Sequence, residues 1–185
     1  MIPAWTVPLV MTLQRLLELA VSRRNLRLAL AQGGREFHPG SFRVIAAMHA
    51  LFIVSLLIGS WGGSIRTGAR TFLLLGLLVL LQVGRYWCMA SLGESWNTRI
   101  VAVPGGSAVR RGPYRFLRHP NYLVVTLEFL LIPLLLEAWW VLAVFFPLNL
   151  LVLRRRIELE ERVLAEQTDY AARFGEAATA PGASP

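Results

Sequence analysis

The chain has 185 residues, of which 55% are hydrophobic and only 16% are charged, and its mean hydropathy is +0.52. Since a soluble domain carries about a quarter charged residues, this composition excludes an ordinary soluble domain. It predicts an integral membrane protein with one domain's length of chain. The net charge is +8, and every basic residue is an arginine. The arginines sit in loops between apolar runs, which favours contact with an anionic membrane face over binding of nucleic acid.

The first apolar run covers residues 3–20. No positively charged segment precedes it and no small-residue cleavage site follows it, so a signal peptide is not expected. Arg15 and Glu18 interrupt the run. Their spacing of three residues puts them on one helix face, where they can form an ion pair.

Two cleaner spans follow. Residues 42–60 carry His49 near their middle, which we interpret as a hydrogen-bonded packing residue rather than a ligand. Residues 71–90 are dominated by Leu and Val. They include Cys88, the only cysteine, which excludes an internal disulfide and a cysteine-built zinc site. We interpret Cys88 as a small packed hydrophobe and expect no metal centre.

A stretch without any apolar run, residues 91–119, comes next. A connection of that length in so small a protein usually carries function. Residues 121–136 and 138–153 are then two apolar segments split at Glu137. At 1.5 Å per residue each reaches about 24 Å, less than the roughly 30 Å hydrocarbon core, so we predict a closely packed helical hairpin.

Glu128 lies inside the first arm of this hairpin, and an ionisable group at that depth by default faces a cavity or a partner. A polar cytosolic helix is predicted over residues 154–175, and residues 176–185 are predicted to be disordered. With the N terminus outside and five crossings, fifteen arginines fall inside and only Arg66 and Arg70 fall outside. This asymmetry predicts an all-α integral membrane protein of about five transmembrane helices, with a cytoplasmic C terminus.

The most unusual stretch is Arg111–Tyr122, which reads Arg-Gly-Pro-Tyr-Arg-Phe-Leu-Arg-His-Pro-Asn-Tyr. Gly112 and Pro113 interrupt any helix, and Pro120 suits the first turn of a new one. A cationic loop therefore leads directly into an apolar helix. Such cations either anchor a helix at the lipid headgroups or hold an anionic ligand. The His-Pro-Asn-Tyr continuation favours the ligand site.

The helix after the hairpin carries a second group of functional candidates. Its apolar stripe, at 100° per residue, consists of Leu153, Ile157 and Leu164. Glu160 and Glu161 flank this stripe, and Arg156 precedes Glu160 by one turn and can orient it. Taken alone, the segment also fits an ordinary solvated helix on the membrane surface.

In this order, the motifs resemble the isoprenylcysteine carboxyl methyltransferase family of integral-membrane methyltransferases. The resemblance rests on Gly112-Pro113-Tyr114-Arg115, Arg118-His119-Pro120-Asn121-Tyr122, Arg156-Ile157 and Glu160-Glu161. A bacterial branch of that family is similar at further positions: Glu18-Leu19, Ser22, Arg24-Asn25, Gly34-Arg35-Glu36, Trp96-Asn97-Thr98-Arg99-Ile100 and Pro104-Gly105. The resemblance implies one membrane-embedded methyltransferase domain over residues 1–175, with its cofactor-binding part over residues 94–175, in a bacterial inner membrane.

The resemblance also implies S-adenosylmethionine as the cofactor, held in a cytoplasm-facing pocket under the long loop and the C-terminal helix. The implied cofactor-binding residues are Tyr114, Arg118, His119, Pro120, Tyr122, Glu160 and Glu161. The residues with an implied catalytic role are Arg156, Glu160 and Glu161. The residues expected near the substrate are Glu94, Trp96, Asn97 and Glu128. Arginine and histidine suit the cofactor's carboxylate, a tyrosine ring suits its adenine or sulfonium, and the acids suit its ribose hydroxyls or ammonium.

The expected methyl acceptor is an oxygen of a hydrophobic molecule that enters from the bilayer. A carboxylate acceptor needs only a cation to orient it, for which Arg156 is the candidate. A phenol or enol must lose a proton, and Glu94, Glu128 or Glu161 could take it. The bacterial branch suggests alkylpyrones or alkylresorcinols as acceptors. The expected partners are therefore this lipophilic molecule and membrane lipids, with no nucleic acid, and the protein is treated as a monomer.

Two alternatives stay open. A phospholipid N-methyltransferase would share the central motif and transfer the methyl group to an amine headgroup. A non-enzymatic scaffold or small transporter would use Arg118 and His119 to bind an anionic lipid.

Overall fold

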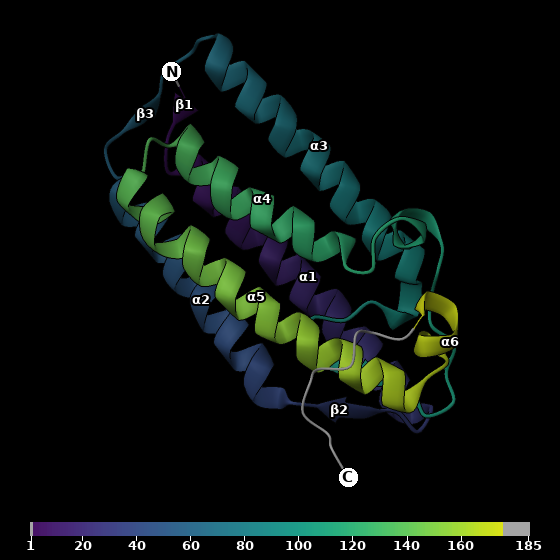
Figure 1. Cartoon of the computed structure of the whole chain (residues 1–185). Helices are drawn as coiled ribbons and strands as arrows, with labels where there is room; N and C mark the ends of the chain where they lie inside the picture. Colours follow the sequence, from purple (N-terminus) through teal and green to yellow (C-terminus); the bar gives the residue numbers. More distant parts are fainter. Residues whose placement is uncertain (1, 176–185) are drawn as a thin grey trace.

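The computed structural model describes residues 2–175, which form a bundle of long helices with two short strand pairs (Figure 1). The helices are α1 (Thr6–Ala31), α2 (Pro39–Gly59), α3 (Ala69–Leu92), α4 (Pro120–Leu135), α5 (Trp139–Gln167) and α6 (Tyr170–Phe174). The α3–α4 connection contains two 3-10 turns, η1 (Gly93–Ser95) and η2 (Gly112–Arg115). The predicted all-α class fits this architecture. Residues 176–185, for which disorder is predicted, lie outside the described residues.

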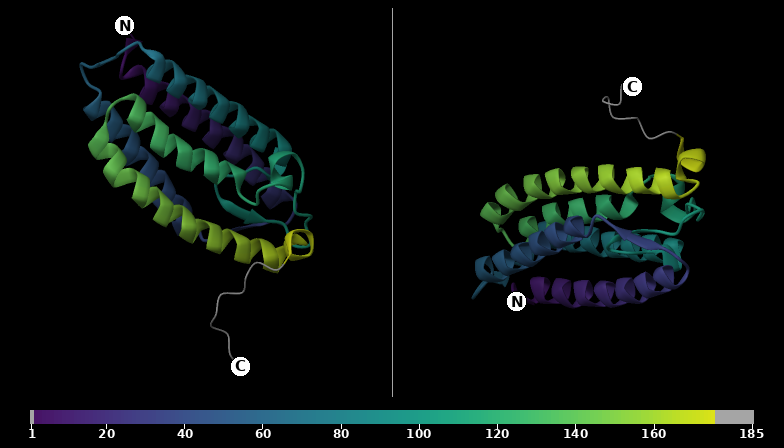
Figure 2. Two further views of the ribbon diagram at one scale, coloured as in Figure 1. Left: turned by 45° about the horizontal axis from the view of Figure 1, so that its top comes forward. Right: turned by 90° about the horizontal axis from the view of Figure 1, so that it is seen from below.

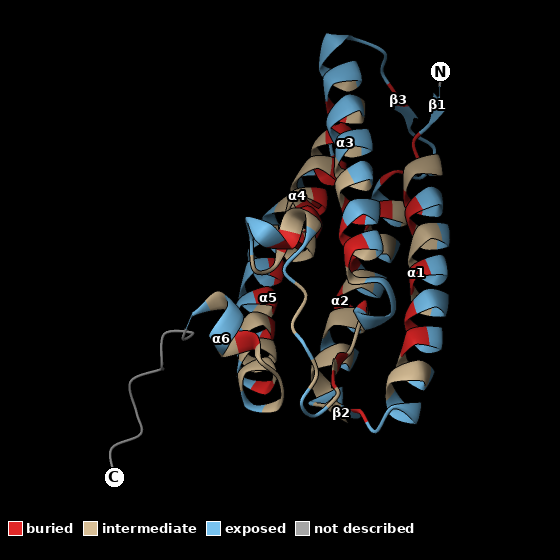
Figure 3. Cartoon of the chain, turned by 90° about the vertical axis from the view of Figure 1, so that its right-hand side faces the viewer, coloured by how far each residue is buried: buried red, intermediate tan, exposed pale blue. Residues whose placement is uncertain are grey.

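The two ends of the bundle differ. The N-terminal segment and the α2–α3 connection lie at one end, and the α3–α4 connection and α6 lie at the other (Figure 1). Across the bundle, α1 lies on the opposite side from α4 and α5 (Figures 2 and 3). The end that carries α6 is called the α6 end below.

Each end is fastened by a short antiparallel strand pair that the sequence did not indicate. β1 (Ile2–Pro3) pairs with β3 (Ser64–Ile65) at the N-terminal end. At the α6 end, β2 (Arg35–Phe37) pairs with β4 (Ile100–Ala102), with Arg35 opposite Ala102. The second pair ties the α1–α2 connection to the α3–α4 connection, and it holds β4 in place as one wall of the site described below.

The predicted helical hairpin is present as α4 and α5. Residues 136–138 connect the two helices, with Glu137 in the left-handed region at φ 55°. The backbone N–H of Ala138 donates to the carbonyl of Pro133 at 2.9 Å, which closes the turn. In the core, the ring of Phe52 from α2 stacks on that of Phe129 from α4, with centroids 4.0 Å apart.

One boundary differs from the prediction. The separate polar helix over residues 154–175 does not exist as such, because α5 continues without a break from the apolar arm to Gln167. No glycine or proline lies between Asn149 and Gln167, so nothing in the sequence interrupts the helix there. The chain leaves the helix only at Thr168, and the short α6 follows.

Within the described residues, two helices are long and apolar enough to cross a membrane. These are α2, and α3 together with η1 over Ala69–Ser95. α4 is apolar but has only 16 residues. Several large apolar side chains on these and the other long helices are exposed, among them Leu17, Leu73, Leu80 and Leu151. Apolar surface of that extent on a folded chain marks a lipid or protein contact. Five crossings and the orientation of the termini stay predictions.

Candidate functional site

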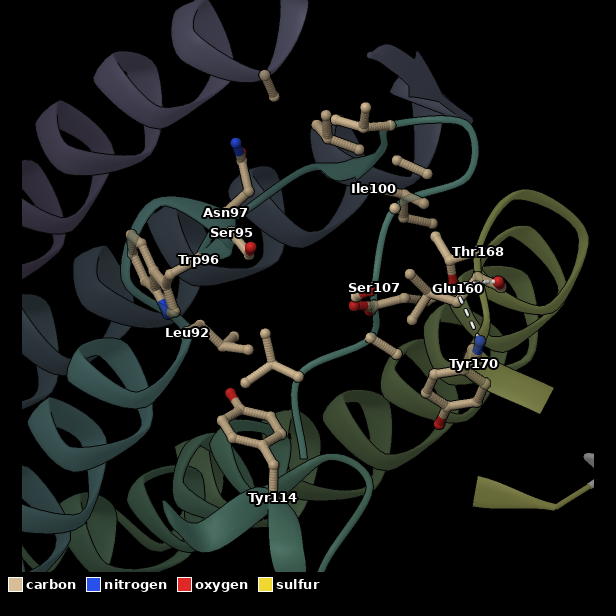
Figure 4. A pocket seen from close by; sticks show the side chains of 18 of the residues that line it. Leu92, Ser95, Trp96, Asn97, Ile100, Ser107, Tyr114, Glu160, Thr168 and Tyr170 are labelled. Atoms are coloured by element: carbon tan, nitrogen blue, oxygen red, sulfur yellow. Dashed lines mark hydrogen bonds between the residues drawn. The ribbon is translucent and has the colours of Figure 1, made fainter. Parts of the chain in front are cut away.

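A cavity of about 390 Å³ lies at the α6 end of the bundle, within the size range of cofactor sites. Its walls come from the C-terminal turns of α1, from η1 and β4, from residues 106–109, from η2 and the start of α4, and from α5 and α6. Figure 4 shows Trp96 and Tyr114 on one side of it, with Glu160, Thr168 and Tyr170 on the other. Segments far apart in the sequence therefore converge on one space.

The central motif forms η2 and the first turn of α4. At Gly112 the chain turns with φ +56°, and Pro113 follows in the first turn of η2. This places Tyr114 in the cavity wall with its side chain almost fully buried. Removal from water raises the pKa of the Tyr114 phenol well above its usual range, so the hydroxyl stays protonated. Pro120 then opens α4, as predicted.

The acidic residues of α5 meet this motif in two adjacent clusters. In the first, Nε2 of His119 lies 3.2 Å from Oε1 of Glu161, and Nη1 of Arg118 lies 3.6 Å from the same oxygen. The hydroxyl of Tyr170 donates to that carboxylate at 3.3 Å. Glu161 is thus the common partner that holds Arg118 and His119 in place.

In the second cluster, the hydroxyl of Tyr122 donates to the carboxylate of Glu160. Arg156 lies behind this pair with only 3% of its surface exposed. It donates to the Tyr122 hydroxyl at 3.2 Å and lies 3.8 Å from the Glu160 carboxylate. It also donates to Oγ of Ser41 and to the carbonyl of Thr98, both at 3.0 Å. Arg156 therefore orients Tyr122 and Glu160 and joins α5 to α2 and to the loop after η1.

Most of the predicted site residues line the cavity. They are Glu94, Trp96, Asn97, Tyr114, Arg118, His119, Tyr122 and Glu160. Pro120, Arg156 and Glu161 are not part of the lining; they lie behind it. The predicted apolar stripe on α5 also differs, because the inward face there carries Leu153, Arg156 and Val163 as its buried residues.

Glu128, expected near the substrate, is not brought to the cavity. Its carboxylate accepts from Arg15 at 2.6 Å and from Arg85 at 2.5 Å, and both arginines also pair with Glu18. These four side chains, called the buried quartet below, join α1, α3 and α4 in the bundle interior. The predicted Arg15–Glu18 pair is part of this quartet, and the expectation that Glu128 faces a partner is confirmed.

Two further residues of α1 shape the site; both were quoted for the resemblance to the bacterial branch but were given no role. Asn25 is buried and donates through Nδ2 to the carbonyls of Gly93 and Trp96, at 3.1 and 2.7 Å. The hydroxyl of Ser22, also buried, accepts from the backbone N–H of Thr98 at 3.0 Å. Both hold the loop that follows α3 against α1. Their signal in the sequence was that resemblance.

Asn121 is a cavity-lining residue that was quoted for the motif but given no role. Its Oδ1 is buried and has no hydrogen-bond partner among the described residues. A buried polar atom without a partner is costly. The amide is therefore available to a ligand that brings its own donors and acceptors to the first turn of α4.

A C-terminal strap, Thr168–Phe174, closes the cavity from the α6 end. The side chain of Asp169 accepts from the backbone N–H of Ala108 at 2.5 Å and from Nε of Arg173 at 2.6 Å. The backbone hydrogen bond from Ala108, followed by that from Arg173, lowers the pKa of Asp169. Nη2 of Arg118 donates to the carbonyl of Phe174 at 2.9 Å. The strap is thus tied both to the long loop and to the central motif.

Together, the fold and the cavity define a helical protein with an extensive apolar surface and a polar, aromatic-lined cavity at one end. The model of the isoprenylcysteine carboxyl methyltransferase (ICMT) family matches residues 74–166. The chain belongs to this family of membrane methyltransferases, whose enzymes use S-adenosylmethionine. The predicted family is confirmed.

Two curated relatives are bacterial. The uncharacterized protein YpbQ of Bacillus subtilis is 37% identical over 162 residues, which cover 88% of this chain and 96% of that protein. An uncharacterized protein of Haemophilus influenzae is 22% identical over 152 residues, which cover 82% and 88% of the two chains. No solved structure matches the chain.

Proposed function

We propose that this protein is an S-adenosylmethionine-dependent methyltransferase that methylates an oxygen of a hydrophobic, membrane-partitioned acceptor. The observation that carries the proposal is the junction of the central motif with Glu160 and Glu161 at one cavity. Membership of the family supplies the reaction class. We further propose that the protein spans the bacterial inner membrane with this cavity on the cytoplasmic side, and that it works as a monomer.

The cavity residues fit the chemistry of S-adenosylmethionine. Arg118 and His119, held in place by Glu161, would bind its carboxylate. The positive end of the α4 dipole would assist, because a helix N-terminus favours negative charge. Glu160 would accept from the ribose hydroxyls or the ammonium, and the ring of Tyr122 would pack against the adenine or sulfonium. Bound there, the cofactor supplies an electrophilic methyl group.

The protein itself contributes by positioning the two reactants and by excluding water from the site. An in-line displacement gains most from alignment of the two reactants in a site closed to bulk water. The strap and the loop it is tied to close the cavity. Arg156, for which a catalytic role is implied by the resemblance, is better described as a positioning residue, because it touches Tyr122 and Glu160 and does not line the cavity. The acceptor would be of the alkylpyrone or alkylresorcinol type.

The proposal is tested by calorimetry with S-adenosylhomocysteine on the detergent-solubilised protein. Wild type should bind, and His119→Ala and Glu160→Gln should each weaken binding by about 10-fold to 100-fold, the cost of one hydrogen bond to a charged group. The matched control is Glu158→Gln, an exposed residue of α5 whose partner, Arg154, is also exposed. A wild-type protein that does not bind the compound would instead support the non-enzymatic scaffold.

Lipid extracts then separate the two enzymatic readings. Cells that express the protein should accumulate methyl ethers or esters of hydrophobic molecules. New methylated phosphatidylethanolamine species would assign the protein to the N-methyltransferases instead.

A further inference from the structure

A second, smaller cavity lies at the N-terminal end of the bundle, opposite the α6 end (Figure 1). Its volume is about 80 Å³, well below the roughly 300–1,000 Å³ of a site that encloses a whole small molecule. Its walls come from the segment before α1, from β3 and the start of α3, and from the last turn of α4 with the turn to α5. A space of this size suits one compact group at the end of a larger molecule.

The floor of this cavity is apolar and fixed. It consists of four buried residues that form a small core of their own: Ala4, Ile65, Leu74 and Leu135. Strand pairing places Ile65 opposite Ile2, so the backbone holds this part of the floor. The floor therefore offers an apolar surface that is in position before any ligand arrives.

The solvent side of this cavity is cationic. Arg66 and Arg70 both line it and both are exposed, and Glu137 is the one acid among the described residues of the lining. The lining thus carries a net positive charge. These are also the two loop arginines predicted to lie outside, against fifteen inside. Because loops on that side are ordinarily poor in arginine, the presence of both in one small cavity points to a local role for their charge.

Arg70 is held in place by three neighbours. Its Nη2 donates to the carbonyl of Leu134 at 2.9 Å, and its Nη1 lies 3.5 Å from Oε1 of Glu137. Its guanidinium carbon lies 5.7 Å from the ring centroid of Trp139. The ion pair with Glu137 is more than half exposed on both sides, and such pairs are weak. An incoming anion can therefore replace this carboxylate while the other two contacts keep Arg70 positioned.

The start of α3 is an unfavourable place for two arginines. The hydroxyl of Thr71 donates to the carbonyl of Arg66 at 2.6 Å, which holds the segment before α3 against its first turn. Arg70 belongs to that first turn, and residues 69–72 include no acid. The positive end of a helix dipole disfavours cations. An anion bound at these two guanidinium groups would offset this repulsion.

Exposed tryptophans show where this end lies in a membrane. Four of the six tryptophans are at this end, each at least 42% exposed: Trp5, Trp61, Trp139 and Trp140. Tryptophan is enriched at the boundary between the hydrocarbon core and water. In a chain embedded in a membrane, the cavity therefore lies at the depth of the lipid headgroups, where the most abundant anionic group is a phospholipid phosphate.

From this arrangement we propose that the cavity at the N-terminal end binds the phosphodiester group of an anionic phospholipid. Arg66 and Arg70 bind the phosphate, and the apolar floor contacts the glycerol backbone next to it. A headgroup with net negative charge, such as phosphatidylglycerol, is preferred over phosphatidylcholine, because a zwitterionic headgroup brings its own cation to a net positive lining. This site lies at the opposite end from the proposed methyl transfer and does not depend on it.

Native mass spectrometry of the full-length protein in neutral detergent measures the Kd for phosphatidylglycerol and for phosphatidylcholine with the same acyl chains. Wild type should prefer phosphatidylglycerol. The double variant Arg66→Gln/Arg70→Gln should raise the Kd for phosphatidylglycerol by about 10-fold or more, the cost of lost hydrogen bonds to a charged group. Glu137→Gln should lower this Kd, because the competing carboxylate is gone. The matched control is Arg154→Gln, since Arg154 also pairs with an exposed glutamate, at 3.3 Å.

Hydrogen exchange then locates the bound lipid. Phosphatidylglycerol should slow exchange in residues 64–72 and 134–140 more than phosphatidylcholine does, and the double variant should remove this difference. Arg66→Gln alone keeps the three contacts of Arg70, so it should fold as wild type does and still raise the Kd. This single variant separates loss of the site from loss of the fold.

Three results would overturn the proposal. They are equal Kd values for the two lipids in wild type, an increase in Kd for Arg154→Gln as large as that for the double variant, and exchange in residues 64–72 that does not respond to phosphatidylglycerol. Inorganic phosphate serves as the probe for the other source of the same group. If it binds as tightly as phosphatidylglycerol and protects the same residues, the cavity is a site for free phosphate and not for a lipid.

Discussion

Gly112 shows how closely one residue of the central motif is constrained. Its φ of +56° belongs to the left-handed region that favours glycine. A side chain there would also collide with Oγ of Ser91 and would approach Nε1 of Trp87 to 3.0 Å. The glycine therefore lets η2 pack against the last turns of α3, which sets the position of Tyr114 in the cavity wall.

We predict that Gly112→Ala destabilises the protein by about 1–3 kcal/mol, the usual cost of a strained backbone position. The collision with Ser91 adds to the strain, so the loss should exceed that of Gly105→Ala. Gly105 has φ +73° but open space around it, and this control isolates the backbone term. Thermal unfolding in detergent measures both variants. Equal losses in the two would show that the contact with Ser91 does not matter.

At the residue scale, the sequence predicted which residues form the site better than it predicted which of them contact one another. The sequence indicated two groups of site residues. His119 and Tyr122 belong to a cationic motif that leads into an apolar helix, and Glu160 and Glu161 flank an apolar stripe. It could not be predicted which acid faces which partner, since that depends on the rotation of α5 relative to α4. Asn121 was quoted for the motif but given no role, because an asparagine near a helix start is ordinary until its Oδ1 is seen to lack a partner.

At the scale of elements, the strap depends on a few bonds at the surface. Asp169 connects it to the loop through Ala108, and its pKa is lowered by this contact. A carboxyl group whose pKa is lower in the folded state stabilises that state above its ordinary pKa, and the contribution disappears as the pH falls through the folded value. The strap should therefore loosen in acid before the helical bundle does.

We predict that Asp169→Asn accelerates hydrogen exchange in residues 105–110 and 170–174 at neutral pH, while α2 stays protected. Binding of S-adenosylhomocysteine should weaken in acid for wild type. In the variant, binding should be weaker already at neutral pH and should show a smaller change in acid. Hydrogen exchange with mass spectrometry and calorimetry across pH 3–7 provide the two measurements. An identical acid dependence in both proteins would remove Asp169 from this role.

The sequence predicted that the long helices exist, but it did not predict where α5 ends. The apolar runs predicted α2, α3 and the α4–α5 hairpin, because a long, continuous apolar segment is typical of a helix and too long for a strand. The break assumed near residue 154 followed the change in composition from apolar to charged. A change in composition does not by itself end a helix, and neither glycine nor proline, the two poorest helix formers, is present there. The two strand pairs escaped notice because segments of two and three residues carry no pattern.

At the scale of the whole molecule, the buried quartet joins three helices by charge rather than by apolar packing. Gln82 donates to Glu128 at 2.8 Å and Gln14 donates to Glu18 at 3.0 Å, so the carboxylate oxygens are satisfied. Two arginines against two glutamates leave the group neutral. The spacing of Arg15 and Glu18 predicted one pair of the four residues. The remaining pairs come from tertiary structure alone.

We predict that Glu128→Gln destabilises the protein by about 3–5 kcal/mol, because two arginines in the bundle interior would then share the single carboxylate of Glu18. The double variant Arg85→Gln/Glu128→Gln should cost less than the sum of the two single changes. Glu137→Gln is the matched control, since Glu137 pairs with Arg70 where both side chains are more than half exposed, and it should cost about 1 kcal/mol or less. Additive losses in the double variant would contradict the coupling.

Because α5 is continuous, the orientation of its apolar N-terminal part determines the direction in which Glu160 points. With 29 residues it is about 43 Å long, more than the thickness of the hydrocarbon core. Because no glycine or proline lies between Asn149 and Gln167, rotation or sliding of this stretch of α5 carries Glu160 with it. One residue inserted in the apolar arm would turn Glu160 by about 100° away from Tyr122. If the proposed function holds, bilayer thickness and lipid packing would therefore change the position of Glu160 in the cavity.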